Sequence, residues 1–269
     1  MNCSRVAAIF IRQLFLFKSN PTRLASIFLW IFIDILQWGF ISKYLGSLGQ
    51  QTFSFVTVIL GAIILWDFMS RMQQGIMMSF LEDIWSQNFI NFFASPLKLK
   101  EYLSGLIATS LLTGFAGFLV MIGMAQLIFR FNVFKIGWLL AAFMCILLIF
   151  GIAMGIFISA MIFRLGPSAE WLGWPIPLVL SLFAGVYYPV ATLPHALRII
   201  SYALPPSYAF ESIRAILTSG TSTYTLLFNL VLGTLLAVCY LIVTCLIFIH
   251  VYRRNLQNGS IARFNAESL

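Results

Sequence analysis

The stretch from residue 134 to residue 163 reads FKIGWLLAAFMCILLIFGIAMGIFISAMIF, and Lys135 is its only charged side chain. A helix that crosses about 30 Å of hydrocarbon at 1.5 Å per residue needs roughly 20 mainly apolar residues. This stretch therefore predicts a bilayer-spanning helix. The whole chain has the same character, because 61% of its 269 residues are hydrophobic and 9% are charged, against about 25% charged in soluble domains. A water-soluble globular domain is excluded, since so much apolar surface would aggregate in water.

Apolar runs of this length occur six times, each bounded by charged residues, Pro, Gly or a polar cluster. The six predicted spans are Leu24–Ser42, Phe53–Gln74, Tyr102–Phe129, Phe134–Phe163, Trp171–Tyr188 and Tyr224–Val251. The sequence thus predicts an all-α polytopic membrane protein with six transmembrane helices in a single domain over residues 1–269. The six-span core covers residues 24–251, and a cytoplasmic tail covers residues 252–269.

The basic residues predict the side of the membrane on which the termini lie. An even number of spans puts both termini on one side, and cytoplasmic segments carry the excess of Lys and Arg. With cytoplasmic termini, the outer segments hold Lys43, Arg130, Lys135, Arg198 and Arg214. The other eleven of the 16 basic residues then lie inside, so we expect both termini in the cytoplasm. This topology and anionic lipid explain the net charge of +8 without nucleic acid as a partner.

Residues 1–23 predict a helix, from about Val6 to Lys18, that lies in the inner membrane interface. One face of its helical wheel carries Val6, Phe10, Leu14 and Phe17. Another face carries Arg5, Arg12 and Ser19. The alternative interpretation is an apolar flanking segment without a fixed orientation.

The segment Phe80–Leu103, FLEDIWSQNFINFFASPLKLKEYL, predicts an amphipathic cytoplasmic helix between the second and third spans. One side of this helix holds Leu81, Ile84, Trp85, Asn88 and Phe92, and the other holds Glu82, Asp83, Ser86, Gln87 and Asn91. Ser95 is predicted to cap the next helix and Pro96 to be its first residue. Glu82 and Asp83 would lie poorly against anionic lipid and therefore favour a protein partner. A helix that only lies on the membrane surface is the alternative.

The segment Leu182–Ser219, LFAGVYYPVATLPHALRIISYALPPSYAFESIRAILTS, is apolar enough to enter the membrane, but its prolines exclude one straight helix. We expect two short helices that dip back from the outer face, the first starting at Pro194 and the second at Pro206. The second would carry Glu211 and Arg214 as an i, i+3 pair. A loop folded on the outer surface is the alternative.

The chain has no phosphate-binding loop of the GxxxxGK[ST] type, because no Gly is followed by Lys. ATP-driven transport would therefore need a separate ATP-binding subunit. The main alternative is an ion-coupled secondary transporter, which needs ionisable groups near the membrane midplane. Asp34 lies mid-way along the first span and is a possible pathway residue or a structural hydrogen-bonding group. Asp67 and Arg71 share a helix face and predict an intrahelical pair.

No catalytic motif accompanies the two histidines, His195 and His250, which are predicted on opposite sides of the membrane. We therefore expect no enzymatic activity and no bound metal or cofactor in this chain. A structural or channel-like membrane subunit is a third possibility.

Small residues at i, i+4 spacing mark one face of two predicted spans. They are Gly105, Thr109, Thr113 and Gly117 in the third, and Gly151, Gly155 and Ser159 in the fourth. Such stripes let helix backbones approach closely. Static packing and helix sliding explain them equally well.

Two groups of residues resemble the permease subunits of type 2 ABC transporters, which are mostly bacterial exporters. The outer group is similar to the family signature and consists of Gly185, Pro189, Leu193, Pro194, Leu197, Pro205, Tyr208, Glu211 and Arg214. The inner group resembles the family's cytoplasmic "SPL" segment and consists of Leu81, Glu82, Ser95, Pro96 and Leu97.

The resemblance implies the six-helix permease half of an ATP-driven exporter in the bacterial inner membrane. It implies a second permease copy or a close relative, and two cytoplasmic subunits that bind ATP and Mg. The residues expected to couple to those subunits are Leu81, Glu82, Asp83, Trp85, Ser95 and Pro96. Drug-like amphiphiles, lipids and lipid-linked saccharides all remain possible substrates.

Overall fold

The structure is a computed structural model that describes residues 2–19, 21–48, 52–86, 88, 91–92, 95–131, 137–218 and 223–258. Every regular element among these residues is a helix. The all-α prediction is therefore confirmed for the described part of the chain.

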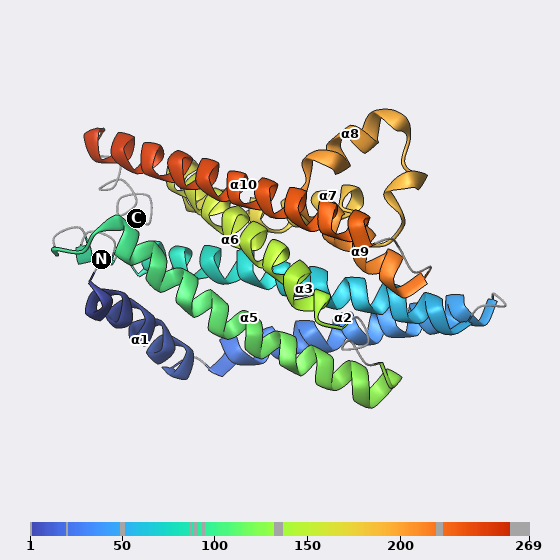
Figure 1. The fold of residues 1–269 in the computed structure, drawn as a ribbon. Coiled ribbons are helices and arrows are strands. Elements are labelled where there is room, and N and C mark those ends of the chain that lie inside the picture. The colour runs from blue at the N-terminus through green and yellow to red at the C-terminus, as the bar shows by residue number, and fades with distance from the viewer. Residues whose placement is uncertain are drawn as a thin grey trace.

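Five long helices run side by side along the length of the molecule and form a bundle (Figure 1). They are α2 (Pro21–Leu48), α3 (Thr52–Trp85), α5 (Leu99–Phe129), α6 (Leu139–Leu165) and α10 (Thr223–Gln257). By length and composition, α5, α6 and α10 could each cross a membrane. Each long helix overlaps one predicted span, and the crossing of the bilayer by α2 and α3 stays a prediction.

The fifth predicted span, Trp171–Tyr188, is not one straight helix. It is divided into η2 (Pro167–Gly173), a 3-10 helix, and α7 (Pro175–Phe183), which has nine residues. Gly166, with φ of 100°, ends α6, and Pro175 occupies the first turn of α7. An α-helix of nine residues is about 14 Å long at 1.5 Å per residue. It therefore cannot span a bilayer alone.

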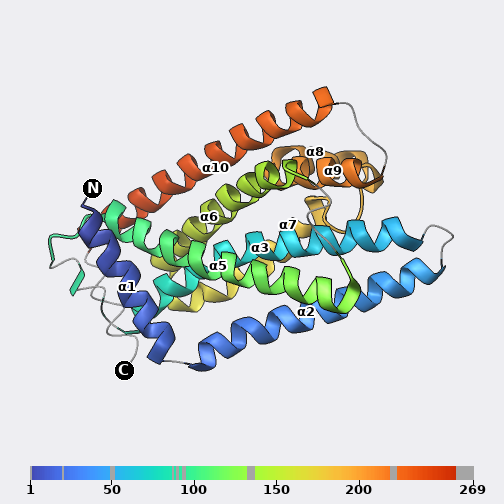
Figure 2. The same cartoon turned by 60° about the horizontal axis from the view of Figure 1, so that its bottom comes forward.

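The predicted pair of short helices between the fifth and sixth spans is present. They are α8 (His195–Ala203) and α9 (Pro205–Thr218), preceded by the 3-10 turn η3 (Val190–Thr192). They lie in the half of the bundle away from α1 (Cys3–Ser19) (Figure 1). The start of α1 and the end of α10 both lie toward the opposite end of the bundle (Figure 1 and Figure 2). Whether α8 and α9 re-enter a membrane stays a prediction.

Helix α3 lies at the centre of the bundle and packs against α2, α5 and α6. Its fully buried side chains include Leu60, Ile64, Phe68, Met72 and Ile76. The small residues of α6 face this helix: a Cβ at Gly151 would lie 2.7 Å from the Met69 carbonyl oxygen, and one at Gly155 would lie 3.0 Å from that of Gln73. The predicted small-residue stripe of the fourth span is thus a close contact between two backbones.

Gly151→Ala should destabilise the bundle by about 1–3 kcal/mol, because backbone atoms of α3 cannot move aside for the new methyl group. Gly123→Ala on α5 is the matched control, since a Cβ there meets no atom within 4 Å. That change should leave stability equal or higher, because Ala is the better helix former. Thermal unfolding of both purified variants in detergent tests the contrast. Equal shifts in Tm would contradict the close packing of α3 and α6.

Candidate functional site

Helix α1 packs across the end of the bundle where α3 ends and α5 begins. Its buried side chains are Ile9, Gln13 and Phe17, spaced four residues apart. Ile9 approaches α5 at Gly105, where a Cβ would come within 2.5 Å of it. Ile11 and Phe15 are 49% and 62% exposed, as expected of a helix whose outer face meets lipid. The predicted helix is confirmed, and its place in the membrane interface stays a prediction.

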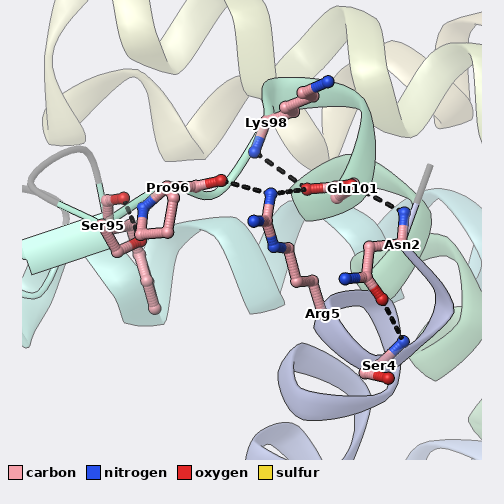
Figure 3. Close-up of polar contacts among 8 residues, drawn as sticks. Asn2, Ser4, Arg5, Ser95, Pro96, Lys98 and Glu101 are labelled. Carbon is pink, nitrogen blue, oxygen red and sulfur yellow. Dashed lines mark hydrogen bonds and ion pairs between the residues drawn. The ribbon is translucent and has the colours of Figure 1, made fainter.

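The first turn of α5 is bound to α1 through the carboxylate of Glu101 (Figure 3). Its Oε1 accepts a hydrogen bond from the backbone N–H of Asn2 at 2.8 Å. Its Oε2 accepts one from the backbone N–H of Lys98 at 3.1 Å and pairs with Arg5 Nη1 at 3.3 Å. Arg5 also donates to the carbonyl oxygen of Pro96. One carboxylate thus caps α5 and holds the start of α1.

The last turn of α3 is bound to α1 through Asp83. This side chain is fully buried and forms an ion pair with Arg12. Its Oδ2 accepts a hydrogen bond from the Tyr102 hydroxyl at 2.7 Å, and the Arg12 guanidinium lies 4.9 Å from the centre of the Phe92 ring. A buried carboxylate needs such partners, because its desolvation is otherwise strongly unfavourable. We call Arg5, Arg12, Asp83, Glu101 and Tyr102 the inner clasp.

The inner clasp corrects part of the sequence interpretation. Arg5 and Arg12 do not form a separate polar face of α1, because they bind the carboxylates of α5 and α3. Asp83 is not part of an exposed acidic tip: α3 continues without a break to Trp85, and this places Asp83 beneath α1. Glu82 is only partly buried.

The other predicted coupling residues divide between the interior and the surface. Leu81 is fully buried, whereas Trp85, predicted on the same side of the helix, is 52% exposed. Ser95 and Pro96 lie in an exposed turn, and α5 begins at Leu99, three residues later than predicted. The Ser95 hydroxyl donates to the carbonyl oxygen of Phe92 instead of capping α5. Part of the predicted surface helix, at positions 87, 89, 90, 93 and 94, lies outside the described residues.

The outer signature residues surround one tight turn. Gly185 has φ of 74°, a conformation that side chains with a Cβ rarely adopt. Arg214 Nη2 donates to the carbonyl oxygens of Gly185 and Val186 at 2.8 and 3.4 Å. Glu211 Oε1 accepts the backbone N–H of Val190 at 2.9 Å. Both charged side chains of α9 therefore hold the turn that precedes α8.

The prolines of the outer segment punctuate its helices. Pro189 and Pro194 are the residues that precede η3 and α8, and Pro205 is the first residue of α9. The second short helix thus begins one residue before the predicted Pro206. Arg198 on α8 donates from Nε to the carbonyl oxygen of Leu193 at 2.8 Å. This segment is a compact, internally bonded unit.

A cavity of about 340 Å³ lies where the end of α1 meets α2, α3 and α5. Asp34, the possible pathway residue, lines it together with Asp67 and Arg71. The predicted intrahelical pair is confirmed, with 2.6 Å between Arg71 Nε and Asp67 Oδ2. Among the described residues, no group of three or more His, Cys, Asp or Glu side chains is arranged to hold a metal ion.

The sequence profile of the ABC-2 type transporter family matches residues 4–218. The chain belongs to this family. The ABC-2 match identifies it as the membrane permease component of an ABC transporter, and the ATPase is a different component. The matched range contains all of α1 except Cys3, together with the whole inner clasp, the cavity and the outer signature. No individual curated protein matches the chain.

In this ABC-2 permease, Arg12→Met should lower the stability of the folded chain by about 3 kcal/mol, because it leaves the buried Asp83 carboxylate without its cation. Adding Asp83→Asn should recover at least half of that loss, since the buried charge is then removed as well. Thermal unfolding of the two single variants and the double variant measures the coupling.

Lys18→Met is the matched control, because Lys18 lies on the same helix and is exposed. It should change stability by no more than about 0.5 kcal/mol. Strictly additive losses in the Arg12 and Asp83 variants would contradict the ion pair.

Proposed function

We propose that this permease is the transmembrane half of an ATP-driven exporter. It works as a pair of permease chains, formed by a second copy or a close relative, with two ATP-binding subunits bound at the end that carries α1. The inner clasp is the observation that carries the proposal. It connects α1, α3 and α5 at the end of the bundle on which the ATP-binding subunits would act.

The surface that would receive the ATP-binding subunit surrounds the inner clasp. Trp85 is 52% exposed at the end of α3, and Ser95 and Pro96 are exposed in the turn before α5. Glu82 is partly exposed next to them. A large, half-exposed Trp beside polar residues is the kind of side chain that dominates protein interfaces. The contact therefore centres on Trp85 and this turn, with Asp83 acting from beneath as a support.

The inner clasp would make the force on this surface reach several helices at once. Asp83 belongs to α3, Glu101 and Tyr102 to α5, and both arginines to α1. A push on the turn before α5 would therefore move the ends of these helices as one body. The translocation pathway would then open and close between the two permease chains.

The proposed setting is the inner membrane of a bacterium, with both termini in the cytoplasm. The distribution of basic residues supports this orientation, with eleven of 16 on the side of the termini. ATP and Mg would be bound by the partner subunits and no cofactor by this chain. Amphiphiles, lipids and lipid-linked saccharides are the substrate classes that a pathway beside lipid accepts.

The alternative function is an ion-coupled secondary transporter, and Asp34 in its cavity is the observation that favours it. Such a transporter needs no ATP-binding subunit. Isolation of the complex separates the two functions. If the tagged chain brings down no ATPase and still transports in vesicles energised by a proton gradient, the exporter proposal fails.

Trp85→Asp should reduce the amount of ATP-binding subunit that co-purifies with the tagged permease at least ten-fold. A charge at the centre of the contact would remove its apolar anchor without entering the core of the permease. Trp138→Asp is the matched control, since Trp138 is 77% exposed and precedes α6 at the other end of the bundle. Both variants should keep the Tm of the parent. Normal co-purification and ATPase stimulation with Trp85→Asp would refute this placement of the contact.

A further inference from the structure

The cavity between α1, α2, α3 and α5 has walls from four helices and from the segment that follows η2. Phe17 comes from α1, Trp30 and Asp34 from α2, Asp67 and Arg71 from α3, and Trp174 from the link to α7. Its volume of about 340 Å³ is at the small end of the range for ligand pockets. It would enclose a head group or a small molecule, but not a whole lipid.

The charges on the cavity wall are unequal. Arg71 carries one positive charge and is bound at 2.6 Å by Asp67, which supplies one negative charge. Asp34 adds a second carboxylate, so three ionisable groups give a net charge of −1 when all are ionised. Among the described residues, none donates a hydrogen bond to Asp34 or pairs with it in a salt bridge. A carboxylate in a bilayer-spanning helix, which α2 is predicted to be, needs a counter-charge because water is scarce there.

The remaining walls suit a cation. Trp30 and Trp174 both line the cavity and are 56% and 54% exposed, and Phe17 adds a third aromatic ring. Aromatic faces attract ammonium groups, and aromatic side chains combined with a carboxylate recognise quaternary ammonium groups in particular. Neither an anionic nor a neutral head group would provide a positive counter-charge for Asp34.

The outer side of α2 suits an apolar tail. Leu29 and Phe32 flank Trp30 on this helix and are 59% and 47% exposed. A ligand whose head group occupied the cavity could therefore place an alkyl chain against the lipid-facing surface of α2. Such a ligand could reach the cavity from the bilayer as well as from the end of the bundle where α1 lies.

We propose that this cavity binds the ammonium head group of a cationic amphiphile, with Asp34 as the counter-ion and Trp30 and Trp174 as the aromatic walls. The Asp67–Arg71 pair closes the cavity on the α3 side, with the positive charge of Arg71 bound directly to Asp67. The inference rests on the proposed exporter function and deepens it, because it names ammonium amphiphiles as the substrate class. Binding to the isolated permease, however, does not depend on ATP.

The test is isothermal titration of the purified permease in a neutral maltoside detergent at low ionic strength. Three probes share one alkyl chain and differ in head group: hexyltrimethylammonium, hexyl glucoside and hexyl sulfate. The ammonium probe should bind at least ten-fold more tightly than the other two. Asp34→Asn should weaken its binding at least ten-fold, whereas Asp34→Glu, which keeps the charge, should weaken it less than three-fold.

Two variants control for charge and for aromatic surface. Glu170→Gln removes a carboxylate and Trp138→Leu removes an indole, and neither residue lines the cavity, so both variants should bind the ammonium probe as the parent does. Trp30→Leu and Trp174→Leu should each weaken it at least three-fold. The Tm of every variant shows whether it is folded.

Two results would overturn the inference. The first is unchanged binding of the ammonium probe to folded Asp34→Asn. The second is tighter binding of hexyl glucoside than of the ammonium probe to the parent, which would make the cavity a sugar site. Loss of ATPase co-purification, by contrast, would refute the exporter function and leave these binding results unaffected.

Discussion

The structure depends on the burial of one carboxylate. Asp83 is fully enclosed at the end of α3, where an ionised group is tolerated only with a cation and hydrogen-bond donors beside it. Arg12 and Tyr102 supply them, and they come from two other helices. The need to satisfy Asp83 therefore fixes α1 against α3 and α5. Glu101 adds a second bond between α1 and α5, so α1 is part of the bundle rather than a loose membrane anchor.

This arrangement connects the proposed contact surface with the interior. The turn that holds Ser95 and Pro96 is tied to α1 by Arg5, and α3 continues from Trp85 into the closely packed core beside Gly151. A displacement at the surface would thus act on the helices that line the cavity around Asp34. The ion pair between Asp67 and Arg71 lies on the same helix, α3, about three to four and a half turns before Asp83.

The sequence predicted those features that depend on composition and local spacing. Long apolar runs predicted the long helices, Pro194 and Pro206 marked the two short ones to within one residue, and the spacing of Asp67 and Arg71 predicted their ion pair. It did not predict that Asp83 is buried. The pattern that begins at Phe80 is typical of a separate surface helix, whereas in the structure these residues continue α3 as far as Trp85. The partners of Asp83 and Glu101 lie 71 and 96 residues away along the chain. The two arginines of the largely apolar helix α1 were the available signal, and only tertiary packing determines which carboxylates they bind. The divided fifth span was missed because Pro175 was counted within an apolar run.

The central claim is that α1 moves together with α5 when ATP-binding subunits act on the permease. Pulsed electron–electron double resonance between spin labels at Ala8 on α1 and Leu112 on α5 measures this directly. Both positions are exposed and can therefore carry a label. The distance distribution should be the same in the nucleotide-free and ATP-bound complex, whereas the distance between the Leu112 labels of the two permease chains should change. A distance between α1 and α5 that shifts or broadens with ATP would contradict the account.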